Sequence, residues 1–186
     1  MKKTYGQYNS AKNKKSPEHD EMTLFLNEHQ KEFLRYLFDK YKSFLDYLNE
    51  NEIEKYQMIL EKLVTYKKND YSSEEIIGYI DIAMPVWFRK AKSYEDRLNE
   101  LRQGYNDGGE DESCMEVFII EIKPKQDSFG DIVRQLKYYK HYTGGVGVKV
   151  LVTKENKNEE AFLGQDILFI DYNDFKKFVE KSKKWQ

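Results

Sequence analysis

Two short apolar runs, each carrying charged residues, constrain the fold of this chain more than any other feature. The first is Ile76–Met84 (IIGYIDIAM), with Asp81 between two isoleucines, and the second is Met115–Lys123 (MEVFIIEIK), with Glu121 and Lys123 at its end. Their length and their β-branched residues predict two buried strands. A charge in such surroundings is costly unless it is paired or binds a metal ion. The two runs therefore predict a sheet with polar chemistry in its interior.

Strands and helices alternate over the C-terminal two thirds of the sequence. We expect Pro85 to end the first of the two strands. The other predicted elements are a helix over 87–104, an acidic loop over 104–113, a helix over Phe129–Tyr142, strands over Val146–Thr153 and Asp166–Tyr172, and a helix over Asp174–Lys183. Strands interleaved with helices favour an α/β fold, with layers of helix packed on a sheet.

The N-terminal third is expected to be a polar tail followed by helices. Residues 1–20 are rich in lysine and polar residues, which is typical of a flexible basic tail. Apolar residues then recur at three- and four-residue steps as far as about Lys68, which predicts two amphipathic helices. We therefore expect an N-terminal helical extension over residues 21–51 and a domain over 52–186, with an insertion at about 87–113.

The composition excludes several classes of site. The chain has a net charge of −2 and a single cysteine, Cys114, so it can form no disulfide within itself and no four-cysteine zinc or iron–sulfur site. It has no run of about 18 apolar residues, and no N-terminal apolar run of signal-peptide length. We expect a soluble, cytoplasmic protein without membrane contact. We expect Cys114 to contribute to packing rather than to act as a nucleophile.

Asp81, Glu121 and Lys123 are the candidate catalytic residues. Strand side chains alternate, so Glu121 and Lys123 point to one side of their strand, and the three residues converge if the strand of Asp81 lies alongside. Two carboxylates and a backbone carbonyl suit Mg²⁺ or Mn²⁺, which activates a bound water, while a nearby lysine stabilises charge on a phosphate. This pattern predicts phosphodiester hydrolysis. Taken alone, Glu121-Ile122-Lys123 favours a structural ion pair, because Glu-x-Lys strings are common.

The helix after the second strand carries a further polar pair. Gln135 and Tyr139 are four residues apart, which places them one turn apart on a stripe beside the buried one. Arg134, Lys137 and His141 lie toward solvent on the same helical wheel. Gln135 and Tyr139 are therefore within reach of a ligand at the edge of the sheet.

In this order, the motifs resemble those of the PD-(D/E)XK nuclease superfamily, in its RecB-type branch with a Q-x-x-x-Y motif. The matching pieces are Gly78–Ile82, Ile120–Lys123 and Gln135–Tyr139, and the resemblance covers about residues 52–180. It implies a restriction-endonuclease-like mixed sheet flanked by helices, and a Mg²⁺-dependent nuclease with DNA as the expected substrate. The implied roles are metal ligation for Asp81, Glu121 and the Ile122 carbonyl, catalysis for Lys123, and orientation of active-site groups or of the nucleic acid strand for Gln135 and Tyr139.

Two features depart from the family pattern. Ile80 stands where the family name has proline, and the distance from Asp81 to Glu121 is long, which the expected insertion explains. The family often places an acid or a histidine on the first core helix. Glu54 and Glu61 are both candidates for that position, and the sequence does not choose between them.

The histidines and the acidic loop predict no second metal site. His19 at the end of the polar tail, His29 in a helical stretch, and His141 each lack a partner at metal-ligand spacing. We interpret them as ordinary surface or boundary residues, with phosphate contact as an alternative for His141. The acidic stretch over 107–112 lacks the ligand spacing of a calcium loop, which favours a solvated hairpin tip.

Nucleic acid binding requires a local basic face, because the net charge provides no global attraction. The candidates beside Lys123 are Lys125, Arg134, Lys137, Lys140 and Lys149, and the alternative is a solvated helix face. We expect DNA as the partner, and the N-terminal helices offer a surface for a homodimer or a protein partner. The alternative function is a non-catalytic regulatory module on the same fold that binds nucleic acid or a protein, because fold does not dictate function.

Overall fold

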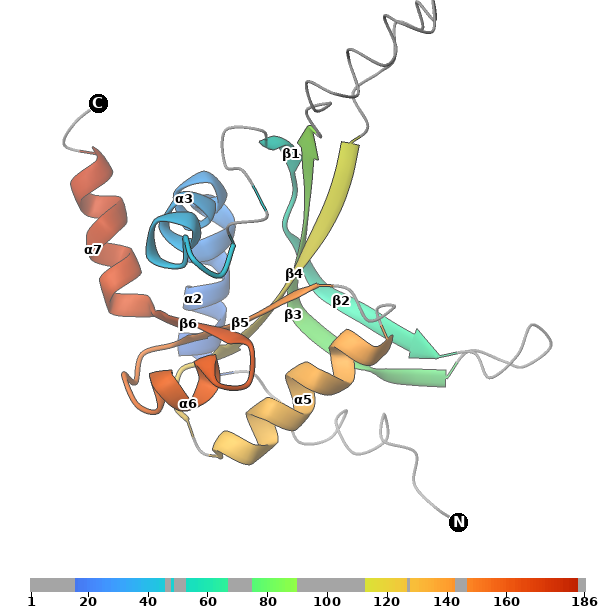
Figure 1. Cartoon of the computed structure of the whole chain (residues 1–186). Helices are drawn as coiled ribbons and strands as arrows, with labels where there is room; N and C mark the ends of the chain where they lie inside the picture. Colours follow the sequence, from blue (N-terminus) through green and yellow to red (C-terminus); the bar gives the residue numbers. More distant parts are fainter. Residues whose placement is uncertain are drawn as a thin grey trace, which may run out of the picture.

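A mixed β-sheet with helices on both of its faces forms the fold (Figure 1). The computed structural model describes residues 16–45, 48, 53–66, 75–89, 113–126, 128–142 and 147–183. The helices are α2 (Pro17–Glu28), α3 (Gln30–Lys40), α5 (Phe129–Tyr142), α6 (Glu159–Leu163) and α7 (Tyr172–Lys183). The strands are β1 (Ile53–Tyr56), β2 (Ile59–Tyr66), β3 (Glu75–Arg89), β4 (Ser113–Lys123), β5 (Val148–Thr153) and β6 (Ile167–Asp171).

The described strands form one six-stranded sheet in the order β1-β3-β4-β5-β6, and β2 is an additional partner of β3. β1, β2 and β4 run antiparallel to β3, whereas β4, β5 and β6 run parallel to one another. β3 is 15 residues long and changes partners along its length. Its N-terminal half pairs with β2, and its C-terminal half lies between β1 and β4.

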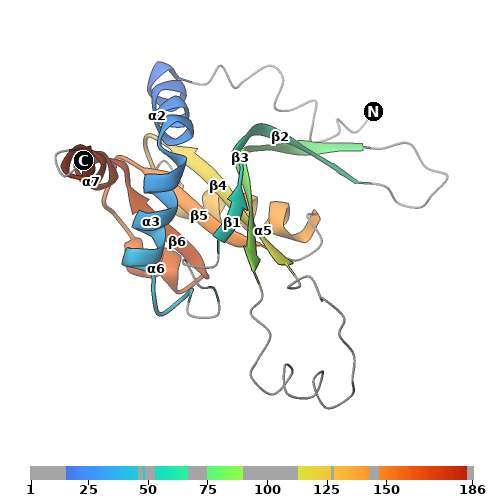
Figure 2. The ribbon, with the colours of Figure 1, turned by 90° about the horizontal axis from the view of Figure 1, so that it is seen from above.

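Helices cover the two faces of the sheet with two separate hydrophobic cores (Figure 2). On one face, α2, α3 and α7 pack against alternate strand residues such as Ile120 and Val150. On the other face, α5 and α6 pack against the intervening residues such as Ile119 and Leu151. This alternation follows from the two-residue period of a strand. No described helix combines the length and the apolar character that crossing a bilayer requires.

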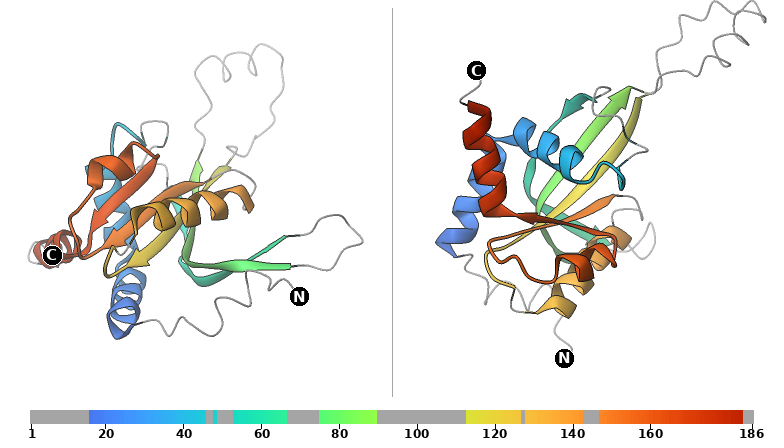
Figure 3. Two further views of the ribbon diagram at one scale, coloured as in Figure 1. Left: turned by 90° about the horizontal axis from the view of Figure 1, so that it is seen from below. Right: turned by 60° about the vertical axis from the view of Figure 1, so that its left-hand side comes forward.

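β2 and the first residues of β3 extend beyond the rest of the sheet as a two-stranded arm (Figure 3). β4 pairs with β3 only from Ile82 onward, so the residues of β3 before Ile82 have β2 as their described partner. Val64 and Ile80 pack this arm against α5. Leu63 and Tyr79 are cross-strand partners on the arm, and both are exposed.

Most of the predicted C-terminal elements are confirmed. The predicted helix over Phe129–Tyr142 is α5 with the same bounds. The confirmed strands and the last helix are β4, β5, β6 and α7, each within two residues of its predicted start. The short helix α6 was not predicted. Of the helix predicted over 87–104, Trp87–Arg89 belong to β3, and the rest lies outside the described residues, as does the acidic loop over 104–112.

The helix predicted up to about Lys68 is wrong after residue 52, where β1 and β2 form instead. The helical spacing of apolar residues was misleading because some of them remain at the surface: Leu60 and Leu63 are exposed on the arm. Long-range pairing with β3 holds both strands, and such context routinely overrides a local pattern. The first predicted helix, which was expected to extend to about Leu48, is confirmed in part: it forms as α2 and α3, which are separated at His29, and α3 ends at Lys40.

Pro85 does not end its strand, which was predicted to stop there. β3 continues to Arg89 because Pro85 lies where the strand exchanges one partner for another. The pairing with β2 ends at Ala83, and the pairing with β1 begins at Val86. The missing N–H donor of proline therefore costs the strand little stability at this position. The carbonyl of Pro85 still accepts a hydrogen bond of 3.2 Å from the Gln57 N–H.

Candidate active site

The candidate site lies at the point where β3 and β4 diverge. Ile82 and Ile120 are the last pair between these strands on the side of the arm. The residues of β3 before Ile82 belong to the arm and pair with β2. Just beyond this point, Oδ2 of Asp81 accepts a hydrogen bond of 2.9 Å from the backbone N–H of Ile122. The carboxylate thus takes the place of the next backbone rung and satisfies a buried donor. Asp81 is itself buried, and the main chain of β4 fixes its position.

Glu121 brings a second carboxylate to the same point. It is only 1% exposed. Its Oε1 lies 2.7 Å from Nζ of Lys123 and accepts a second hydrogen bond of 2.7 Å from Nε2 of Gln135. Its Oε2 is buried and has no hydrogen-bond partner among the described residues. An oxygen in this state is suited to a ligand that supplies positive charge.

Burial and the neighbouring Asp81 charge raise the pKa of Glu121 to about 8, although the Lys123 ammonium opposes this shift. Two carboxylates that share a buried site repel each other, so one of them retains a proton at neutral pH unless a cation compensates. The predicted convergence of Asp81, Glu121 and Lys123 is therefore present, and the electrostatics at this point favour cation binding.

His19 also belongs to the site, and its prediction as an isolated histidine is wrong. Its Nε2 lies 3.1 Å from Oδ1 of Asp81, and its side chain is buried. Thr23 lies on the other side of the ring, with Oγ1 3.4 Å from Nδ1 of His19. Both oxygens of Asp81 thus have a partner, one on β4 and one on α2.

The prediction of a flexible tail over residues 1–20 is wrong from Pro17 onward, where α2 begins. It assigned His19 to the tail, so a contact between His19 and the sheet was not expected. Ser16 is the N-cap, and its side chain accepts a hydrogen bond of 3.2 Å from the His19 N–H. The Ser-Pro pair and the acids Glu18 and Asp20 in the first turn are signals of a helix start that the sequence contained. Residues 1–15 lie outside the described part of the chain.

Neither acid suggested for a first core helix lies on a helix. Glu54 is on β1 and Glu61 is on β2, and both are exposed. The register of the arm brings Glu61 level with Asp81, but its φ of +51° interrupts the regular strand. The first core helix is α2, and the side chain that α2 contributes is His19.

Gln135 and Tyr139 reach the site from α5, as predicted. Nε2 of Gln135 donates both to Glu121 and, at 3.2 Å, to the hydroxyl of Tyr139. Tyr139 is buried with Ile132 and Leu136 in the core beneath α5. The side-chain amide of Gln135 therefore connects Tyr139, which is part of the core, with the carboxylate of Glu121.

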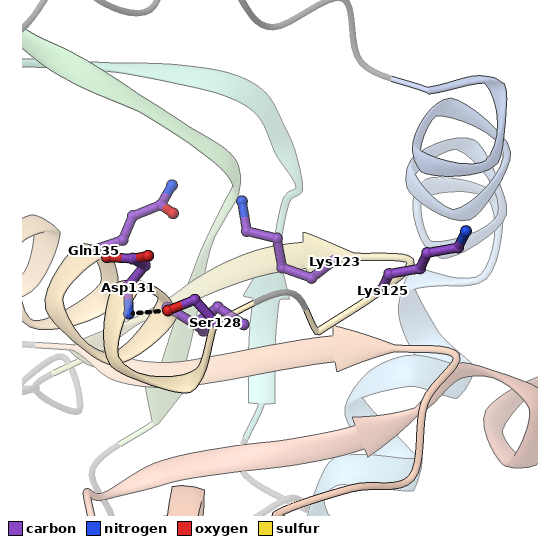
Figure 4. Close-up of a pocket in the computed structure, with 6 residues that line it drawn as sticks. Lys123, Lys125, Ser128, Asp131 and Gln135 are labelled. Atoms are coloured by element: carbon purple, nitrogen blue, oxygen red, sulfur yellow. Dashed lines mark hydrogen bonds between the residues drawn. The ribbon is translucent and has the colours of Figure 1, made fainter.

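A small pocket of about 180 Å³ lies at the start of α5, and its lining includes Lys123 and Gln135, two partners of Glu121 (Figure 4). Its lining residues are Lys123, Lys125, Ser128, Asp131, Ile132 and Gln135. The side chain of Lys123 is 33% exposed, so its ammonium is accessible from solvent while it contacts the buried Glu121. Lys123 thus connects the interior of the site with the surface.

The other predicted basic residues do not form one face. Arg134 points to solvent and pairs with Asp131, while Lys125 extends away from Ser128 toward α2 in Figure 4. The remaining three lie toward the other end of α5. Lys137 donates to the Gln165 side chain at 2.6 Å, and Lys149 donates to the Gln165 carbonyl at 2.8 Å; burial lowers the pKa of Lys149, and the charges of Lys140 and Lys137 lower it further.

The donor set is compatible with a hard cation that keeps some of its waters. The described residues include no group of three or more His, Cys, Asp and Glu side chains arranged to hold a metal ion. Asp81 and Glu121 are two carboxylates at one point, the Ile122 carbonyl is adjacent in the chain, and Oε2 of Glu121 is buried without a partner. Mg²⁺ is commonly bound by one or two carboxylates and several waters, so these residues fit such an ion.

Cys114 and the remaining histidines have no place in this site. Cys114 is exposed at the start of β4, so its predicted packing role is wrong. His29 packs against Phe25, with ring centroids 4.6 Å apart, and His141 is exposed on α5.

Comparisons with models of protein families, with curated proteins and with solved structures find no match for this chain.

Proposed function

We propose that this protein is a nuclease that uses Mg²⁺ or Mn²⁺ to hydrolyse phosphodiester bonds in DNA. The observation that carries the proposal is that Asp81, Glu121 and Lys123 meet at one point of the sheet. A structural Glu–Lys pair would explain Glu121 and Lys123. It would not explain a second buried carboxylate beside them, because burying two like charges is costly without a compensating cation.

The metal ion would be held by Asp81, Glu121 and the carbonyl of Ile122. When bound, the ion compensates the two carboxylates, lowers the pKa of a coordinated water and offsets the charge on a phosphate. The protein contributes by fixing its own ligands. The Ile122 N–H and His19 each hold one oxygen of Asp81, and Gln135 holds Glu121.

Lys123 is the group that meets the phosphate. Its ammonium lies 2.7 Å from Oε1 of Glu121 and lines the pocket beside the site. A phosphodiester that enters this pocket brings its oxygens close to a fixed positive charge. Such a charge stabilises the negative charge that develops on the phosphate during hydrolysis, and it helps to orient the attacking water.

We also propose the restriction-endonuclease-like fold of the PD-(D/E)XK superfamily as the finer classification. Its support is the order of the motifs on the elements. Asp81 lies on β3, the Glu-x-Lys motif ends β4, and the Gln-x-x-x-Tyr motif lies on α5, which follows directly. β3 and β4 are antiparallel neighbours in a mixed sheet flanked by helices.

In the direct test, the purified protein is incubated with single- and double-stranded DNA in the presence of Mg²⁺, Mn²⁺ or EDTA, and cleavage of the DNA is measured. The site variants are Lys123→Ala and Glu121→Gln, and the matched control is Lys177→Ala, an exposed lysine of α7 that pairs with Asp174. We expect metal-dependent cleavage that falls by roughly 100-fold or more in both site variants, because Lys123→Ala removes the positive charge beside the phosphate and Glu121→Gln removes a charged ligand of the metal ion. The control variant should retain the wild-type rate.

Two results would overturn the proposal. One is cleavage that persists in EDTA, and the other is a Lys123→Ala variant as active as the wild type. DNA binding that survives EDTA without cleavage under any metal would instead support the non-catalytic binding module. Cleavage of RNA but not of DNA would retain the metal-dependent mechanism and overturn the proposed substrate.

A further inference from the structure

Gly78, three residues before Asp81 on β3, lies against Tyr139 of α5. It is buried on β3, and its cross-strand partner is Val64. A Cβ atom at this position would lie 3.1 Å from the hydroxyl oxygen of Tyr139 and 3.2 Å from its Cε1. Both distances are shorter than ordinary van der Waals contact, so any side chain here would push the tyrosine ring away.

The backbone of Gly78 does not itself demand glycine. Its φ lies outside the left-handed region, and a glycine inside a strand weakens the strand because it contributes no side chain to packing. An isolated strand glycine marks a close approach by another group. Here the approaching group is Tyr139, so the reason for the glycine is space.

The space at Gly78 accommodates the Tyr139 hydroxyl, and that hydroxyl is one of the two described partners of the Gln135 amide nitrogen. Nε2 of Gln135 has two N–H donors: one points to Oε1 of Glu121 at 2.7 Å, and the other to the Tyr139 hydroxyl at 3.2 Å. If a side chain at residue 78 displaces the hydroxyl, the bond of 3.2 Å, one of the two that define the rotation of the amide, is weakened. The direction of the bond to Glu121 then becomes less defined.

We propose that Gly78 is a positioning residue of the active site, which acts through Tyr139 and Gln135 on the carboxylate of Glu121. The contact also couples the arm to the site, because the arm supplies the wall against which Tyr139 rests. This inference rests on the proposed nuclease function for its catalytic consequence. Its structural part, the link from Gly78 to the Gln135 amide, is independent of that function.

The test is a double-mutant cycle of Gly78→Ala and Tyr139→Leu. Leucine removes the hydroxyl and the ring atoms that a Cβ at Gly78 would meet. We expect Gly78→Ala to lower kcat roughly 10-fold with KM within about 2-fold, because the defect lies in a group that orients a ligand. In the Tyr139→Leu background the same substitution should have no further effect. The matched control is Gly164→Ala, whose Cβ would meet only two carbonyl oxygens at 3.5 and 3.6 Å, and it should behave as the wild type.

A second readout does not require activity. In ¹H–¹⁵N spectra, the two side-chain amide protons of Gln135 should be widely separated in the wild type, because one donates to a carboxylate and the other to a hydroxyl. Gly78→Ala should reduce this separation, and Gly164→Ala should not. If wild-type protein cleaves no nucleic acid, the nuclease proposal fails while the spectra still test the positioning role.

Two outcomes would overturn the positioning role. One is an unchanged Gln135 amide signal in folded Gly78→Ala protein. The other is a loss of activity from Gly78→Ala that is equally large in the wild-type and Tyr139→Leu backgrounds. If Gly78→Ala alone does not fold, recovery of folding in the double variant supports the contact with Tyr139, and failure to recover contradicts it.

Discussion

At the scale of single residues, Glu121 has the most demanding environment in the described site. Its carboxylate is almost fully buried, lies beside a second carboxylate and has one oxygen without a hydrogen-bond partner. Burial and the Asp81 charge raise its pKa to about 8, against a usual value of 4.5. In the absence of a cation, the folded protein therefore holds a proton on this pair that the unfolded chain releases.

This difference predicts that metal-free protein becomes less stable as pH rises. The contribution of Glu121 to the free energy of unfolding is fully present below pH 4.5, the pKa of this residue in the unfolded chain. It is lost as pH rises through the folded pKa of about 8. The slope is up to about 1.4 kcal/mol per pH unit. Urea denaturation in EDTA between pH 5 and 8 measures it. Glu121→Gln should lack this decline relative to the wild type, and parallel pH profiles for the two proteins would refute the prediction.

His19 is the second residue whose environment makes a prediction. It holds one oxygen of Asp81, a ligand in the proposed metal site, and substitution of groups that orient a metal ligand typically changes affinity or activity by roughly 10- to 100-fold. We expect His19→Ala to reduce both the cleavage rate and the Mn²⁺ affinity by a factor in this range. Cleavage assays and calorimetric titration measure the two effects. The control is His29→Ala, at the junction of α2 and α3. An equal loss of cleavage rate and Mn²⁺ affinity in this variant would point to a general defect of the N-terminal helices.

Five of the six side chains that form the site could be predicted from sequence, because simple periodicities determine them. Two-residue alternation on a strand sets Glu121 and Lys123, and four-residue spacing on a helix sets Gln135 and Tyr139. Asp81 required the further assumption that its strand lies beside the other. His19 could not be found in this way, since it reaches Asp81 through a tertiary contact between α2 and the sheet, and no local pattern encodes that contact.

At the scale of elements, the outer edge of β6 shows how the described sheet ends. β6 is the last strand in the order, so one side of it lacks a further strand. The Tyr41 hydroxyl satisfies both backbone groups of Phe169: it accepts a hydrogen bond of 3.0 Å from the N–H and donates to the carbonyl. Lys40 donates to the same carbonyl at 3.0 Å. Side chains from the end of α3 thus replace a neighbouring strand, and edges covered in this way resist pairing with other chains.

We therefore expect Tyr41→Phe to destabilise the protein by about 1–3 kcal/mol, the cost of leaving a buried N–H without a partner. Urea denaturation measures this as a lower midpoint with an unchanged slope. The control is Tyr138→Phe on α5, an exposed tyrosine whose substitution should cost less than about 0.5 kcal/mol. Equal midpoints for the two variants would contradict the role of the Tyr41 hydroxyl.

Elements were predictable where local pattern and tertiary context agree. α5 has a buried stripe and a polar stripe at helical spacing, and β4 is a long apolar run; both are confirmed. β1 and β2 were mistaken for a helix because nothing within these two short segments encodes their pairing with β3. Pro85 was taken as a strand end because a sequence does not reveal that β3 exchanges partners at that residue.

At the scale of the whole molecule, the site lies between two cores that share little besides the sheet. His19 reaches it from the helices on one face, and Gln135 reaches it from α5 on the other. A ligand that binds Asp81 and Glu121 would therefore link elements from both layers. Ligands that bind only the folded state stabilise it in proportion to the logarithm of their concentration.

Mn²⁺ should accordingly raise the melting temperature if the proposed metal site exists. At a free concentration about 100 times its Kd, the ion adds about 2.7 kcal/mol, which corresponds to roughly 5–10 °C for a domain of this size. Differential scanning calorimetry measures the shift. Asp81→Asn should show none, and a shift of the same size in that variant would mean that the ion binds elsewhere.

The hydrogen bond between the Ile122 N–H and Asp81 has a consequence for how this protein tolerates change. A carboxylate tethered to a peptide group keeps its aim whatever side chain that peptide bears. Ile122 points into the core and could be exchanged for valine or leucine without redirecting Asp81. The position of Asp81 is thus independent of the side chain at residue 122, so substitutions in the surrounding core leave this carboxylate in place.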